Sequence, residues 1–158
     1  MANEHVKGQQ IEGVIITPLK VIPDERGAIY HMLRADSSVF KKFGEIYFSK
    51  IHHGAIKAWH LHTEMIINYS VVSGKIKLVL YDQREDSKTK GNIMEIFMNT
   101  DNHSLVTVPP GVVNGFKCVS YEDAIVANCA SIVHDSNETI RIDPFTKDIP
   151  YDWALKHG

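Results

Sequence analysis

Short apolar segments separated by turn residues dominate this chain, and this pattern restricts it to an all-β architecture. The segments are rich in β-branched and aromatic residues, and Ser73-Gly74 joins two of them as a tight hairpin. They lie at Val14–Leu19, Ala28–Leu33, Glu45–Ile51, Met65–Val72, Lys75–Tyr81, Ile93–Met98, Leu105–Val108, Gly115–Val119 and Ala124–Ile132. Strands this short and this regularly spaced predict a sandwich or barrel.

The remaining sequence adds little regular structure to this barrel. With 158 residues, the chain is long enough for one domain with a real core, and we expect residues 1–158 to form it. Residues 1–24 are expected to be an N-terminal strand segment. Asp36–Phe43 is the best candidate for a short helix, with Asp36 or Ser37 as the N-cap. The tail at 143–158 is rich in proline and aromatic residues, so we predict an irregular segment that packs on the barrel.

Charge and hydropathy exclude several classes of partner. The formal net charge is -2, which gives no indication of nucleic-acid binding, and no apolar run is long enough to span a bilayer. The polar N-terminus is not a signal peptide. Cys118 and Cys129 lie in strand-like segments, which indicates two buried free thiols in a reducing compartment. We therefore expect a cytoplasmic protein with neither a membrane nor a nucleic-acid partner.

One set of spacings resembles half of a metal site. Gly54, His60, His62 and Gly74 are spaced as in the first metal-binding motif of cupin barrels, and Pro109-Pro110-Gly111 begins the second motif. The first motif expects a Glu where this chain has Ile67, and the second expects a His where it has Asn114. The spacing thus predicts a cupin-type jelly-roll barrel, a double-stranded β-helix, in which two expected ligands are missing.

The two remaining histidines allow metal binding or proton transfer. His60 and His62 are two residues apart on a strand and face the same way, while Lys57 has the opposite parity unless a bulge intervenes. Two histidines alone make a weak metal site, because zinc and iron usually collect at least three protein ligands. Histidine also suits general acid–base chemistry near neutral pH, given a carboxylate that orients the ring. A purely structural, hydrogen-bonded histidine is the remaining alternative.

Further motifs extend over most of the chain and identify a family resemblance. They are Asp24-x-Arg26-Gly27, Lys57-Ala58-Trp59-His60, Gly74 followed by Asp82-x-Arg84 and Ser87, Pro109-x-Gly111-x-x-Asn114-Gly115-Phe116, and Asp143-Pro144 followed by Ile149 and Trp153. In this order and spacing, the chain resembles the dTDP-4-dehydrorhamnose 3,5-epimerases and related sugar-nucleotide cupin enzymes, from about Asp24 to Trp153.

The resemblance implies a β-barrel homodimer that binds a nucleotide-diphosphate sugar, a 4-keto-6-deoxyhexose, without a metal or other cofactor. Matched position by position, His60 is the expected base next to the ketone and Asp143 is its orienting partner. Arg26 is expected to contact the diphosphate, which suits the fork geometry of a guanidinium. Lys57, His62 and Asn114 are the other expected substrate-binding residues.

This chain departs from the family at two chemical positions. The family lysine that stabilises the enolate falls on Ile67, and the tyrosine acid falls near 131–133, where no Tyr occurs. Three hypotheses therefore stay open. The first is an epimerase or isomerase that uses His60. The second is a non-catalytic sugar-nucleotide-binding or glycan-pathway partner protein. The third is a metal-dependent cupin enzyme with His60 and His62 as ligands.

Overall fold

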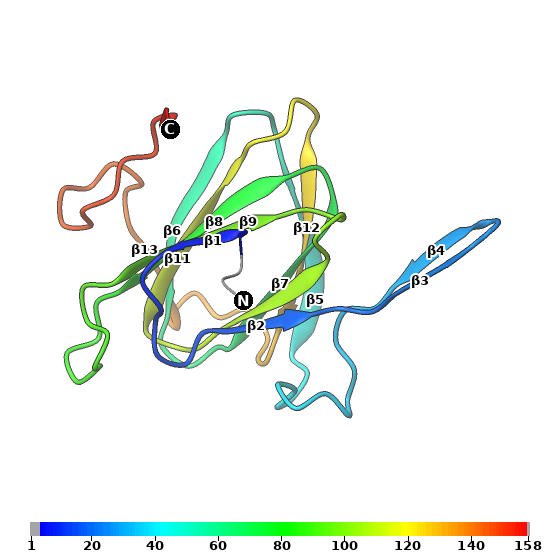
Figure 1. Ribbon diagram of the computed structural model, residues 1–158. Helices are drawn as coiled ribbons and strands as arrows, with labels where there is room; N and C mark the ends of the chain where they lie inside the picture. The colour runs from blue at the N-terminus through cyan, green and yellow to red at the C-terminus, as the bar shows by residue number, and fades with distance from the viewer. Residues whose placement is uncertain (1–3, 158) are drawn as a thin grey trace.

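Two facing antiparallel sheets form the body of the protein (Figure 1). The computed structural model describes residues 4–157, and in this range it shows strands and no helix. The first sheet has the order β1 (Val6–Gly8), β9 (Ile93–Met98), β8 (Ile76–Asp82), β11 (Val112–Cys118), β6 (Ile56–His62) and β13 (Thr139–Arg141). The second has the order β2 (Ile15–Pro18), β10 (Ser104–Val108), β7 (Ile67–Ser73), β12 (Ala124–Ala130) and β5 (Glu45–Ile51). The predicted all-β jelly roll is confirmed.

The alternation of apolar residues explains the core between the sheets. On β8, Ile76, Leu78 and Leu80 share one face and are all 0% exposed. Ile67 of β7 belongs to the same cluster and is 1% exposed. This packing brings the inner faces of β6 and β7 towards each other, and the candidate site lies between them.

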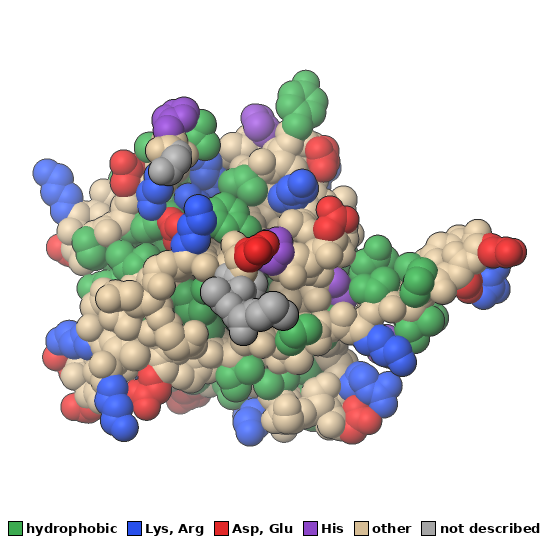
Figure 2. Space-filling model, in the orientation of Figure 1, with side chains coloured by type: hydrophobic (Ala, Val, Ile, Leu, Met, Phe, Trp, Pro, Cys, Tyr) green, Lys and Arg blue, Asp and Glu red, His purple; other side chains and the backbone are tan. Residues whose placement is uncertain are grey.

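A two-stranded hairpin projects from the body (Figure 1). It consists of β3 (Val21–Asp24) and β4 (Gly27–Tyr30), which pair only with each other, and we call it the arm. Its residues are exposed, including Ile22 and Ile29 at 39% and 61%. Figure 2 shows hydrophobic side chains gathered where the arm leaves the body and charged side chains at its tip. An isolated hairpin is at best marginally stable in water, so the arm needs a surface to pack against.

The C-terminal tail fastens to the outer face of β6. Trp153 and Ile149 are both 3% exposed, and the ring of Trp153 lies 4.8 Å from that of Trp59. Lys117 donates a hydrogen bond from Nζ to the carbonyl of Trp153 at 2.9 Å. The tail thus covers the outer side of the strand whose inner side carries His60 and His62.

The predicted helix at Asp36–Phe43 is wrong. This segment forms turns with isolated bonds, from the N–H of Ser37 to the carbonyl of Arg34 and from the N–H of Phe40 to the carbonyl of Ser37. A helix of two turns gains too few hydrogen bonds to offset the cost of nucleation. Within residues 4–157, the protein has no helix long and apolar enough to cross a membrane.

Candidate active site

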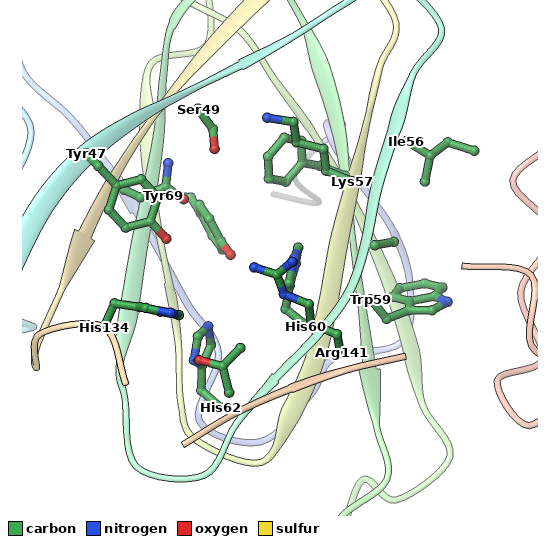
Figure 3. Close-up of a pocket in the computed structure, with 14 residues that line it drawn as sticks. Tyr47, Ser49, Ile56, Lys57, Trp59, His60, His62, Tyr69, His134 and Arg141 are labelled. Carbon is green, nitrogen blue, oxygen red and sulfur yellow. The ribbon is translucent and has the colours of Figure 1, made fainter. Parts of the chain in front are cut away.

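A cavity of about 440 Å³ opens between the two sheets, and its volume suits a small-molecule ligand (Figure 3). Residues of six strands and one loop line it: Tyr47, Ser49, Ile56, Lys57, Ala58, Trp59, His60, His62, Tyr69, Phe116, Asn128, His134, Thr139 and Arg141. The lining contains two permanent cations, Lys57 and Arg141, and three histidines, but no Asp or Glu. The arrangement therefore favours an anionic ligand.

A bulge in β6 brings Lys57 to the same cavity as His60. The pairing of β11 with β6 runs from Asn114↔His60 to Phe116↔Lys57, so two steps on β11 match three on β6. The extra residue reverses the parity of Lys57, which would otherwise face away. Gly115 permits this close approach, since a Cβ there would lie 2.4 Å from the Cβ of Ala58.

His60 faces the cavity with an uncommitted ring. Its cross-strand neighbour on β13 is Arg141, and no hydrogen bond engages its imidazole anywhere in residues 4–157. Burial lowers the pKa of His60 to about 4, and the nearby His62, Arg141 and Lys57 act in the same direction. The ring is therefore neutral at physiological pH and has a free lone pair with which to accept a proton.

His62 is held by a buried carboxylate that the sequence analysis did not identify. Its Nδ1 lies 2.6 Å from Oε1 of Glu138, and the other carboxylate oxygen accepts the backbone N–H groups of Glu64 and Met65. Burial by itself raises the pKa of Glu138, but these hydrogen bonds outweigh burial and hold the pKa at about 2. Since an ionised carboxylate can only accept, Nδ1 of His62 carries the proton and Nε2 is the other ring nitrogen available for chemistry.

The predicted pair of His60 and Asp143 is not formed. Strand β13 ends at Arg141, so Asp143 falls beyond it, in a turn. There its Oδ1 accepts the backbone N–H of Phe145 at 2.7 Å. Of the two histidines of β6, His62 has a carboxylate partner, and the partner is Glu138.

The wall opposite His60 carries two phenols. Tyr69 of β7 is 3% exposed, and its hydroxyl donates to Oδ1 of Asn114 at 2.7 Å. Burial raises the pKa of Tyr69 far above its usual range. Tyr47 of β5 is 42% exposed, and burial followed by the charge of Glu45 raises its pKa. Both hydroxyls point towards the middle of the cavity (Figure 3).

Two predicted ligand residues lie outside this cavity. Arg26 is at the tip of the arm, where it pairs with Asp24 at 2.7 Å. Asn114 is 1% exposed and does not line the cavity, and its Oδ1 accepts the hydroxyl of Tyr69. The structure does bring Lys57, His60 and His62 together in the cavity.

The donor set for a metal is small. Ile67 is part of the core and the amide oxygen of Asn114 is engaged by Tyr69, so neither motif position adds a ligand to His60 and His62. The described residues include no group of three His, Cys, Asp or Glu side chains placed to hold a metal ion.

Several residues of the site were not predicted from the sequence because no motif contains them. The sequence did contain a signal for Tyr47 and Ser49, because they lie two positions apart on a strand and therefore share one face. Arg141 and Glu138 lie in a short strand and the turn before it, which the analysis did not predict. His134 belongs to a loop, and nothing in its surrounding sequence indicates a site.

Comparison with known proteins gives a consistent result. Residues 8–157 match the family profile described as dTDP-4-dehydrorhamnose 3,5-epimerase. The spore coat polysaccharide biosynthesis protein SpsL of Bacillus subtilis (strain 168) is 32% identical over 142 residues, which cover 90% of this chain and 91% of that protein. The probable low-salt glycan biosynthesis epimerase Agl13 of Haloferax volcanii is 32% identical over 144 residues, with coverages of 90% and 89%.

A solved structure extends this similarity to three dimensions. The dTDP sugar isomerase from Desulfovibrio desulfuricans G20 superimposes with a TM-score of 0.90 at 40% identity, covering 93% of this chain and 94% of that one. The match to the family profile, over residues 8–157, includes the strands that line the cavity. The chain belongs to the dTDP-4-dehydrorhamnose 3,5-epimerase family.

Proposed function

We propose that this protein is an epimerase or isomerase of a dTDP-linked 4-keto-6-deoxy sugar, in which a histidine abstracts the proton next to the ketone. The observation that carries the proposal is the cationic, histidine-lined cavity, which has no carboxylate in its lining. The substrate brings a negatively charged diphosphate and develops a further negative charge when its enolate forms. Both charges are stabilised in a site of this kind.

His60 is the proposed base. It lies where the family keeps its base segment, its ring is neutral, and no hydrogen bond occupies it within residues 4–157. The cations that lower its pKa would be offset by the arriving diphosphate and enolate, which makes His60 a stronger base in the complex than in the free protein. His62, oriented by Glu138, is the proposed contact to the sugar.

Arg141 and Lys57 are the proposed replacement for the missing enolate-stabilising lysine. Ile67 occupies that position and lies in the core, so it cannot help. Arg141 pairs with His60 across β13 and β6, and the bulge turns Lys57 into the cavity. Either cation close to the sugar oxygen would supply the electrostatic stabilisation that an enolate requires.

Hydrogen exchange tests this function directly. A dTDP-linked 4-keto-6-deoxyglucose is incubated with the protein in D₂O, and loss of the proton next to the ketone is followed by NMR. His60→Ala should slow the exchange by about 10²–10⁴-fold, the usual contribution of a general base. His52→Ala, at an exposed histidine that contacts Asp123, is the control. Exchange by His60→Ala at the wild-type rate would exclude His60 as the base, and binding without exchange by the wild type would indicate a binding protein.

We also propose that the protein is a homodimer in which the arm packs on a second copy. The arm exposes Val21, Ile22, Ile29 and Tyr30, and its strands pair with no other strand in residues 4–157. A second copy would bury these side chains, and it would bring Arg26, which lies outside its own cavity, to the diphosphate of the partner's ligand. Light scattering should give twice the chain mass for the wild type and a monomer for Ile22→Asp with Ile29→Asp. A monomeric wild type would refute the proposal.

The cytoplasm is the proposed location. Cys118 and Cys129 are buried and form no disulfide, and unpaired thiols of this kind are usual in a reducing compartment.

A further inference from the structure

Inversion of a carbon next to a ketone needs two groups on opposite sides of the sugar ring. A base removes the proton from one face, and an acid must return a proton to the other face. His60 enters the cavity from β6 of the first sheet. The acid must therefore come from the facing wall, which β5, β7 and β12 of the second sheet form (Figure 3).

That wall presents four polar side chains to the cavity: Tyr47, Ser49, Tyr69 and Asn128. A phenol, with an ordinary pKa near 10, is a far better proton donor than a serine hydroxyl or an amide. The choice therefore lies between Tyr47 and Tyr69.

The hydrogen bonds and the burial of the two phenols separate them. The hydroxyl of Tyr69 already donates a hydrogen bond to Oδ1 of Asn114 at 2.7 Å, and this residue is almost completely buried. Tyr47 is open to the cavity, and no residue in the described range accepts its proton. Tyr47 also lies directly opposite Asn128 in the pairing of β5 with β12, so its backbone is held by the sheet.

We propose that Tyr47 is the acid of this site and protonates the sugar on the face opposite His60; the proposal rests on the function given above. In the first step, the C–H bond next to the ketone breaks, the proton moves to His60, and the electron pair forms the enolate. In the second step, the O–H bond of Tyr47 breaks and the enolate pair forms a new C–H bond on the other face. Return of one proton from the imidazolium to the phenolate through solvent restores both groups, and nothing is oxidised or reduced.

The experiment separates removal of the proton from inversion of the carbon. Wild-type protein and the Tyr47→Phe variant are incubated in D₂O with a dTDP-linked 4-keto-6-deoxyglucose, and NMR follows both deuterium incorporation and the inverted product. Tyr47→Phe should still incorporate deuterium at close to the wild-type rate, because His60 is intact. Inverted product should fall by about 10²–10⁴-fold, the range for loss of a general acid. Retained exchange also proves that the variant is folded.

Matched variants complete the test. Tyr121→Phe, at a 90% exposed tyrosine in the turn between β11 and β12, controls for loss of a phenol elsewhere. Inversion by Tyr47→Phe at the wild-type rate, or loss of inversion in Tyr69→Phe but not in Tyr47→Phe, would overturn the proposal. A wild-type protein that exchanges the proton without inverting the carbon would overturn it as well. Absence of exchange in the wild type is a different result, because it removes the proposed function itself.

Discussion

Nδ1 of His62 lies 2.6 Å from Oε1 of Glu138, and both side chains are buried. Glu138 is held in turn by the backbone N–H groups of Glu64 and Met65, just after β6 ends. One carboxylate therefore fixes the orientation of a cavity histidine and closes the loop that follows the histidine strand. Its removal should affect both ligand binding and stability.

Glu138→Gln should lower the free energy of unfolding by roughly 1–3 kcal/mol, since the carboxylate accepts hydrogen bonds from His62, Glu64 and Met65 and an amide leaves part of these buried donors without an acceptor. It should also weaken binding of a dTDP-linked sugar, because the ring of His62 loses its fixed orientation. Urea denaturation and calorimetric titration measure the two effects. Glu85→Gln, at an exposed pair with Lys90, is the control and should change neither quantity appreciably. Unchanged stability in Glu138→Gln would show that the pair contributes nothing.

The same carboxylate predicts how stability depends on pH. The pKa of Glu138 falls from 4.5 to about 2 in the folded protein. Because the folded-state pKa is depressed, its contribution is fully present above about pH 4.5 and disappears as the pH falls towards 2, a loss of about 3 kcal/mol. Denaturation across this window should show a steeper slope for the wild type than for Glu138→Gln. Equal slopes would contradict the assignment.

His60 should remain neutral in mildly acidic solution. Burial, with the charges of His62, Arg141 and Lys57, lowers its pKa from 6.5 to about 4 in the free protein. NMR of histidine-labelled protein should therefore show one cavity ring that stays neutral at pH 5.5, and His60→Gln should remove that signal. A dTDP-sugar should raise the pKa of this ring, because the diphosphate opposes the neighbouring cations. If the signal that His60→Gln removes titrates near pH 6.5 without ligand, the prediction is refuted.

Strand periodicity predicted the all-β class and motif spacing predicted the jelly roll, whereas only part of the site could be predicted. The short apolar runs predicted β5, β7 to β10 and β12 closely, because buried strands alternate in a way that sequence shows directly. The His-x-His spacing on β6 likewise placed His60 and His62 on one face. The prediction of a helix at Asp36–Phe43 was wrong, because this segment forms separate turns despite its local helix signals.

The rest of the site depends on contacts between segments far apart in sequence. Glu138 reaches His62 across 76 positions, and no spacing rule could connect them. Lys57 faces the cavity only because of the bulge opposite Gly115, and Asp143 misses it because β13 ends two residues earlier. Side-chain direction at such irregular places follows from the three-dimensional pairing of strands and not from periodicity.

Gly115 should be essential to the geometry of the site, because it lies against the bulge that turns Lys57 inwards. A methyl group there would lie 2.4 Å from the Cβ and 2.9 Å from the Cα of Ala58, so β6 would have to move. Gly115→Ala should cost about 1–3 kcal/mol of stability, as overpacking usually does, and should reduce exchange of the sugar proton by displacing Lys57 and His60. Thermal denaturation and NMR exchange measure these effects. Ala58→Gly in the same chain removes one of the two clashes and should restore part of both quantities, whereas wild-type activity in Gly115→Ala alone would show that the bulge tolerates the methyl group.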